Sequence, residues 1–108
     1  QLQKLNYFLK NKRELAKKYQ IFFKDTDIHF FEEPKHCKSN FWLNVIVLKN
    51  KSMRDKFLKK TNSNGIMTRP AWILMNKLPM FKNTQSDNLK NSKWLCDRII
   101  NIPSSVTL

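Results

Sequence analysis

The feature that most constrains the fold is an almost continuous apolar run at Phe41–Leu48. β-Branched and aromatic residues dominate this run, and they favour the pleated backbone of a strand. Because polar residues do not alternate through it, we expect a strand that is covered on both faces. Residues 28–31 predict a second strand that ends at Pro34, and the polar residues 35–39 predict the hairpin loop between the two strands.

Two helices are predicted around these strands. In residues 1–20 the apolar side chains recur at helical spacing and lysines occupy the opposite face. Ser52, with Asp55 three residues later, predicts an N-cap and a helix over 53–62 that turns Phe57 and Leu58 inward. Gly65 is the only glycine in the chain, and it tolerates the positive φ that commonly ends a helix.

The remaining third of the chain adds two extended segments and one helix. Residues 66–72 predict a strand or an extended segment, whereas Leu78-Pro79 precludes a long helix through the mixed segment 73–87. A third helix, capped by Asn88 or Ser92, is expected to carry Trp94, Leu95, Arg98 and Ile99, before an extended segment at 100–102.

The element order is therefore α-β-β-α-β-α-β. Such an order predicts the α+β class, with a small, mainly antiparallel sheet and helices packed on one face. The length of 108 residues fits one domain, and no internal repeat or linker divides it.

The net charge of +13 has two interpretations. A basic domain with a pI near 10.1 is typical of a nucleic-acid-binding module. The excess of positive charge, however, comes mainly from lysines that are spread along the chain. The abundance of lysine, asparagine and isoleucine is also what an AT-rich genome produces. We expect weak, non-specific nucleic-acid binding at low salt, and a solvated surface otherwise.

Several classes of chemistry lack their usual residues. One glycine cannot form a phosphate-binding loop, and Glu32 and Glu33 are adjacent, so in a strand they point to opposite faces. Cys37 and Cys96 match no zinc spacing with the two histidines, and they predict ordinary reduced thiols. No apolar run is long enough for a membrane span. We therefore name no catalytic, cofactor-binding or metal-binding residue in this chain.

Arg69 is the strongest candidate for a ligand contact. It stands among apolar neighbours, where an arginine is either a paired structural charge or a group that binds an anion. Trp72 follows it and is either a stacking surface or a core residue. Trp42 and Trp94 are interpreted as core residues.

Several motifs together resemble a known family over roughly residues 40–105, and residues 1–20 fit more loosely as its lead-in helix. The chain is similar to the C-terminal small domain of the DegT/StrS family, which comprises pyridoxal-phosphate-dependent nucleotide-sugar aminotransferases of the aspartate-aminotransferase fold type. The nearest subgroup aminates UDP-linked 4-keto-6-deoxy sugars. The matching segments are Phe41–Asn44, Arg54–Leu58, Asn64–Trp72, Leu74–Met75, Leu78–Phe81, Trp94–Leu95, Asp97–Arg98 and Asn101–Ser105.

The resemblance implies a function and also an absence. It implies that Arg69, Trp72, Asn76 and Lys77 contact the nucleotide-sugar substrate or the amino donor, in a cytoplasmic enzyme that is a homodimer when complete. The lysine that forms the Schiff base with the cofactor belongs to a large domain, which residues 1–108 do not match. The resemblance therefore implies that the isolated chain binds no pyridoxal phosphate and is inactive. Since it begins at Gln1, we expect a processed chain or a piece of a longer polypeptide.

Overall fold

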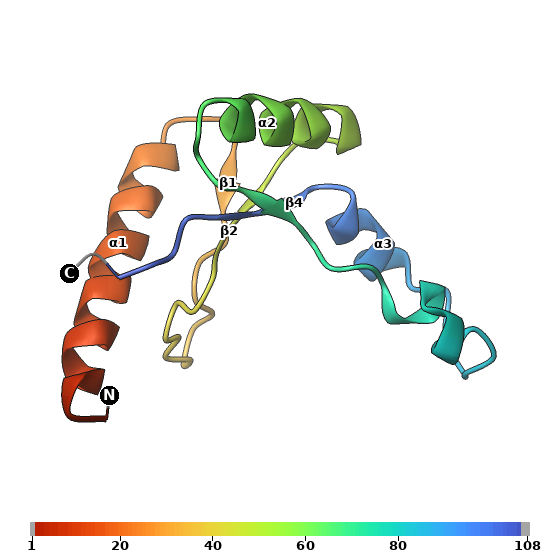
Figure 1. Ribbon diagram of the computed structural model, residues 1–108, viewed down its shortest axis with the longest axis horizontal. Coiled ribbons are helices and arrows are strands. Elements are labelled where there is room, and N and C mark those ends of the chain that lie inside the picture. The colour runs from red at the N-terminus through yellow and green to blue at the C-terminus, as the bar shows by residue number, and fades with distance from the viewer. Residues whose placement is uncertain (1, 107–108) are drawn as a thin grey trace.

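The computed structural model describes residues 2–106 (Figure 1). Its helices and strands follow the predicted order, α-β-β-α-β-α-β, with short 3₁₀ helices added to it. The elements are η1 (Leu2–Lys4), α1 (Leu5–Phe23), β1 (His29–Phe30), β2 (Asn44–Val47), α2 (Lys51–Ser63), β3 (Arg69–Pro70), η2 (Met75–Lys77), η3 (Pro79–Phe81), α3 (Lys90–Cys96) and β4 (Ile99–Ile102).

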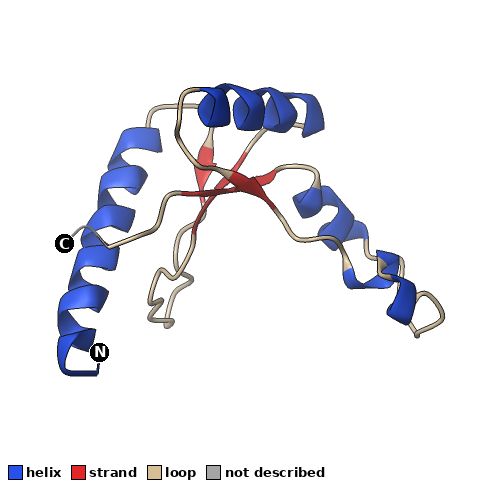
Figure 2. Ribbon diagram, viewed as in Figure 1, coloured by secondary structure: helices blue, strands red, loops and turns tan. Residues whose placement is uncertain are grey.

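The strands of the described chain form one antiparallel sheet in the order β1-β2-β4-β3 (Figure 2). The last strand, β4, enters between β2 and β3, and Ile46 lies opposite Ile100. Arg69 of the edge strand β3 lies opposite Asn101. The predicted antiparallel sheet of the α+β class is confirmed.

One face of this sheet carries the core. Phe30, Ile46 and Ile100 are buried on it, together with Leu48 and Ile102. Helix α1 contributes Ala16 and Phe23 to the same cluster, and α2 packs Phe57 and Leu58 against it. The prediction that helices pack on one face is thus confirmed.

The prediction that the strand at 41–48 is covered on both faces is wrong for this chain. Only the positions that share a face with Ile46 are buried, and Val45 and Val47 remain partly exposed. Phe41 takes a positive φ of 46°, and the strand begins later, at Asn44. Continuous hydrophobicity did not identify the covered face, because all the apolar residues of the run look alike in the sequence.

The first helix extends further than predicted. It continues through Phe23, and burial of that ring in the core stabilises the added turn. Gln1, the first residue of the predicted helix, lies outside the described residues.

The predicted caps of the second and third helices need correction. The N-cap of α2 is Asn50, whose side chain accepts the Met53 N–H at 2.9 Å, so the Ser52 prediction is wrong. Gly65 has a φ of 75° just beyond α2, as expected. The N-cap residue of α3 is Leu89, so neither predicted cap residue holds that position: Ser92 lies inside the helix, and Asn88 precedes Leu89. The Asn88 side chain nevertheless accepts the N–H of Lys90, the first helical residue, at 3.0 Å. The predicted helical residues Arg98 and Ile99 lie beyond α3, and Ile99 begins β4.

Mutation can show whether Asn50 or Ser52 caps α2. We expect Asn50→Ala to lower the free energy of unfolding by about 0.5–2 kcal/mol, because the Met53 N–H loses its acceptor. Ser52→Ala is the matched control and should change stability little. Urea unfolding of both variants checks this. A larger loss for Ser52→Ala would contradict the assigned cap.

Candidate functional site

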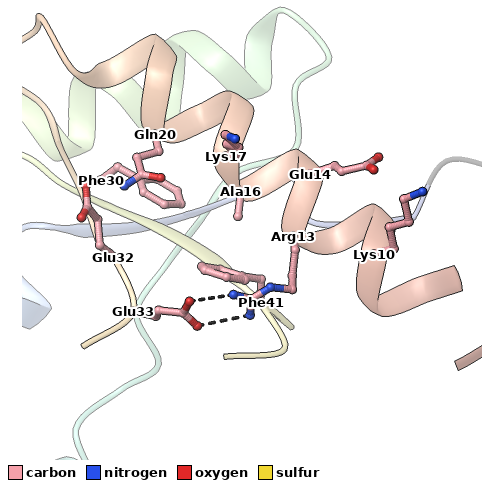
Figure 3. A pocket seen from close by; sticks show the side chains of 10 residues that line it. All are labelled: Lys10, Arg13, Glu14, Ala16, Lys17, Gln20, Phe30, Glu32, Glu33 and Phe41. Carbon is pink, nitrogen blue, oxygen red and sulfur yellow. Dashed lines mark hydrogen bonds and ion pairs between the residues drawn. The ribbon is translucent and has the colours of Figure 1, made fainter. Parts of the chain in front are cut away.

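A hollow of about 440 Å³ lies between α1 and the segment 30–41 (Figure 3). Arg13 and Glu33 face each other in it, and Arg13 donates hydrogen bonds to the two carboxylate oxygens at 2.7 and 3.2 Å. Arg13 also donates to the Ser39 carbonyl at 2.6 Å and lies over the Phe41 ring. The charges of Arg13 and Glu33 thus have partners within the protein. We interpret their ion pair as a structural contact that holds the loop of residues 33–41 against α1.

The Arg13–Glu33 pair predicts a pH dependence of stability. The hydrogen bonds from Arg13, and then that from the Ser39 N–H, hold the pKa of the Glu33 carboxyl below its ordinary value of 4.5. A carboxyl whose pKa is lowered by folding stabilises the folded state above its unfolded pKa, and this contribution is lost as the pH falls through the folded pKa. Glu33→Gln should therefore melt at a lower temperature than the wild type at neutral pH.

The difference in melting temperature should shrink once the pH falls below 4.5 and disappear below the folded pKa of Glu33. Thermal melts of both proteins across this pH range measure it. Glu32→Gln serves as the control, because Glu32 is exposed and forms no ion pair within residues 2–106. A pH-independent difference would contradict the assigned pair.

A second hollow, of about 460 Å³, is lined in part by Arg69. It lies where the edge strand β3 and the neighbouring strand β4 meet the residues that precede β2 and those that follow β4. The residues that line it are Lys12, Trp42, Leu43, Met67, Arg69, Asn101, Ile102, Pro103, Ser104 and Ser105. We call it the Arg69 hollow.

Arg69 differs from the chain's other arginines in its contacts. Arg13 and Arg54 are each paired with a carboxylate, and Arg98 lies over the Trp94 ring at 4.4 Å and donates to main-chain carbonyls. Arg69 is exposed, and its side chain contacts the Met67 sulfur at 3.5 Å. No carboxylate among residues 2–106 forms an ion pair with Arg69. Its guanidinium is therefore free to bind an anion.

The walls of the Arg69 hollow combine charge with apolar surface. Lys12 brings a second cation from α1, and its Nζ donates to the Ser104 carbonyl at 2.6 Å. The Trp42 ring is 66% exposed and Met67 is 64% exposed. This combination suits an anionic group that is attached to a flat or apolar body. The lining residues include no nucleophile paired with a base, so the hollow is suited to binding.

The structure does not bring the four predicted site residues together in this hollow. Arg69 lines it, whereas Trp72, Asn76 and Lys77 do not. The chain leaves β3 along a segment that runs away from the sheet toward η2 and η3, shown in teal in Figure 1. On this segment Trp72 is 70% exposed, Lys77 is exposed and Asn76 is partly buried.

Sequence reasoning missed several residues of the Arg69 hollow. The interpretation of Trp42 and Trp94 as core residues is wrong, because the rings are 66% and 50% exposed. Lys12 was one of many surface lysines, and no sequence pattern relates it to Arg69, which lies 57 positions later (69 − 12). The polar turn before Trp42, where Asn40 accepts the Trp42 N–H, was the available signal that this ring lies outside the strand.

Residues 2–106 contain no group of three or more His, Cys, Asp or Glu side chains that is arranged to hold a metal ion. No described helix is both long and apolar enough to cross a membrane.

Comparison with known proteins identifies a family and a fold. The model of the DegT/DnrJ/EryC1/StrS aminotransferase family matches residues 1–108, which confirms the resemblance. No curated protein matches the sequence.

Solved structures that resemble this chain include the following three. The aminotransferase TlmJ from Streptoalloteichus hindustanus has a TM-score of 0.84 at 15% identity, over 95% of this chain and 28% of that one. The sugar aminotransferase CalS13 from Micromonospora echinospora has a TM-score of 0.82 at 19% identity, and the match covers 95% of this chain and 27% of CalS13. The E. coli GDP-4-keto-6-deoxy-D-mannose-3-dehydratase with bound hydrated PLP has a TM-score of 0.69 at 25% identity, and the match covers 95% of this chain and 28% of the dehydratase. This chain thus spans less than a third of each of these proteins.

Proposed function

The chain belongs to the DegT/DnrJ/EryC1/StrS aminotransferase family, and we propose that it is the C-terminal small domain of a pyridoxal-phosphate-dependent aminotransferase. The proposed substrate is a nucleotide-linked 4-keto-6-deoxy sugar. The family match over residues 1–108 carries this proposal. The residue that we propose for the substrate contact is Arg69, an exposed guanidinium in a hollow with no carboxylate partner among residues 2–106. Its role is to bind an anionic group of the substrates, either the sugar nucleotide's diphosphate or the amino donor's carboxylate.

The cofactor fits no site in the described residues. Pyridoxal phosphate requires a lysine for its Schiff base, held in an enclosed site where burial lowers the pKa of the amine. Every lysine of residues 2–106 is exposed except Lys12, which is partly exposed. In this proposal the cofactor is held by a large domain outside these 108 residues, and the chain contributes substrate contacts. The isolated chain should be inactive, and the complete enzyme should be a homodimer.

The test compares the isolated chain with a polypeptide that joins it to its cofactor domain. Each is mixed with pyridoxal phosphate, a UDP-linked 4-keto-6-deoxy sugar and L-glutamate. We expect the absorbance of a lysine Schiff base and an amino sugar, identified by mass spectrometry, only from the longer polypeptide. A deoxygenated sugar in place of the amino sugar would contradict the reaction. Stable Schiff-base absorbance with turnover by the isolated chain would contradict its inactivity.

A basic nucleic-acid-binding module is the second candidate. The aromatic residues do not exclude it, because Trp42, Trp72 and Trp94 are at least half exposed and could stack on bases. The family match is what favours the aminotransferase domain. We expect binding to a DNA oligonucleotide at low salt that disappears near physiological salt, because it depends on counterion release. Sequence-selective binding that persists there would support the module instead.

A further inference from the structure

The main chain directly before Arg69 is held by a side chain from the end of α2. The Asn62 Nδ2 donates to the Leu58 carbonyl of α2 at 2.8 Å, and it also lies 3.0 Å from the Thr68 hydroxyl and 3.1 Å from the Thr68 carbonyl, so its two hydrogens are shared among three acceptors. The Thr68 N–H in turn donates to the Asn62 Oδ1 at 3.4 Å. Thr68 is only 5% exposed. One amide side chain thus engages the N–H, the carbonyl and the hydroxyl of the residue that precedes Arg69.

A second residue of α2 completes the arrangement. The Thr61 hydroxyl donates to the Phe57 carbonyl at 2.8 Å and lies 2.6 Å from the Thr68 hydroxyl. Because the single hydroxyl hydrogen of Thr61 is engaged by the helix, the Thr68 hydroxyl is the donor between the two. Thr68 therefore donates to Thr61 and accepts from Asn62, which leaves this buried hydroxyl satisfied and with one preferred orientation.

The chain on both sides of Arg69 is also restrained. On the α2 side, Gly65 takes a φ of 75°, and the Ile66 N–H donates back to the Thr61 carbonyl at 2.9 Å. On the other side, Asn101 lies opposite Arg69 across the β3–β4 pair, and its Nδ2 donates to the Pro70 carbonyl at 3.2 Å. The backbone of Arg69 is thus held on both sides, while its guanidinium, within residues 2–106, donates to the thioether of Met67.

We propose that Asn62 and Thr68 are positioning residues, which hold Arg69 in the direction that lets its guanidinium bind an anion in the Arg69 hollow. This inference rests on the proposed anion-binding role of Arg69. A guanidinium whose backbone is already ordered loses less conformational freedom on binding than one on a mobile loop. Fixing the residue before Arg69 therefore raises the affinity for the anion without any contact between Asn62 and the ligand.

The test uses the 108-residue chain, ¹⁵N NMR relaxation at the Arg69 backbone and side-chain Nε, and titration with inorganic pyrophosphate. Asn62→Ala and Thr68→Val remove the contacts, and Thr68→Ser keeps the hydroxyl. Asn64→Ala is the matched control, because the Asn64 side chain donates to the Lys60 carbonyl of α2 at 2.7 Å and forms no hydrogen bond with Thr68 within residues 2–106.

We expect both disruptive variants to increase the mobility of Arg69 and to weaken pyrophosphate binding by roughly threefold to tenfold. Thr68→Ser and Asn64→Ala should match the wild type. An ordered Arg69 in Asn62→Ala, or a mobile Arg69 with unchanged affinity, would overturn the positioning role. If the wild-type chain fails to bind pyrophosphate although Arg69 is ordered, the anion-binding role itself is refuted.

Discussion

Arg69→Ala should leave the melting temperature of the isolated chain nearly unchanged and lower kcat/KM of the polypeptide that carries the cofactor domain. The exposed guanidinium has no carboxylate partner among residues 2–106, so its removal leaves no buried charge unpaired. A lost hydrogen bond to a charged group costs about 1.5–3 kcal/mol, which corresponds to a fall in kcat/KM of roughly 10- to 100-fold. Thermal melts and steady-state kinetics measure the two effects separately.

Lys59→Ala is the matched control for the loss of one positive charge. Lys59 is exposed on α2 and does not line the Arg69 hollow. Its removal should change neither stability nor kcat/KM. If Arg69→Ala instead lowers the melting temperature strongly and leaves kcat/KM normal, Arg69 is a structural residue.

The second large effect concerns the centre of the core. Ile46 and Ile100 are 0% exposed and lie opposite each other in the pairing of β2 with β4. Ile46→Ala should lower the free energy of unfolding by about 2–5 kcal/mol, because it removes buried methyl groups and leaves a cavity. Urea denaturation measures this loss, and Ile46→Val should cost about 0.5–1.5 kcal/mol.

Val45→Ala controls for the loss of apolar volume in the same strand. Val45 is adjacent to Ile46 but points to the opposite, partly exposed face. Val45→Ala should therefore lower the free energy of unfolding clearly less than Ile46→Ala does. Equal losses from both positions would contradict the finding that only one face of the sheet is covered.

The order of the elements was predictable because it depends on local patterns. Helical spacing of apolar residues identified α1, β-branched residues identified β2, and the single glycine marked the end of α2. The helix caps were less predictable, since Asn50 and Ser52 are both good N-cap residues and two positions separate them. The choice between them depends on where the preceding chain leaves the sheet.

The Arg69 hollow was predictable only in part. The sequence singled out Arg69, because an arginine among apolar neighbours requires either a partner or a ligand. It did not show that Trp42 is exposed or that Lys12 belongs to the same hollow. Those facts depend on the docking of α1 against the sheet and on the entry of β4 beside β3, which join segments that lie far apart in the chain.

The sequence by itself determined the α+β class and the element order and singled out Arg69 as a candidate, because local periodicity and residue chemistry carry that information. Only the tertiary structure decided which face of the sheet is buried and which residues share a hollow with Arg69. The same holds for the contact of Asn62 with Thr68, which requires the turn at Gly65 to bring the end of α2 back to β3. Such contacts depend on strand register and on packing, and the pattern of apolar and polar residues in a single sequence does not specify either of them.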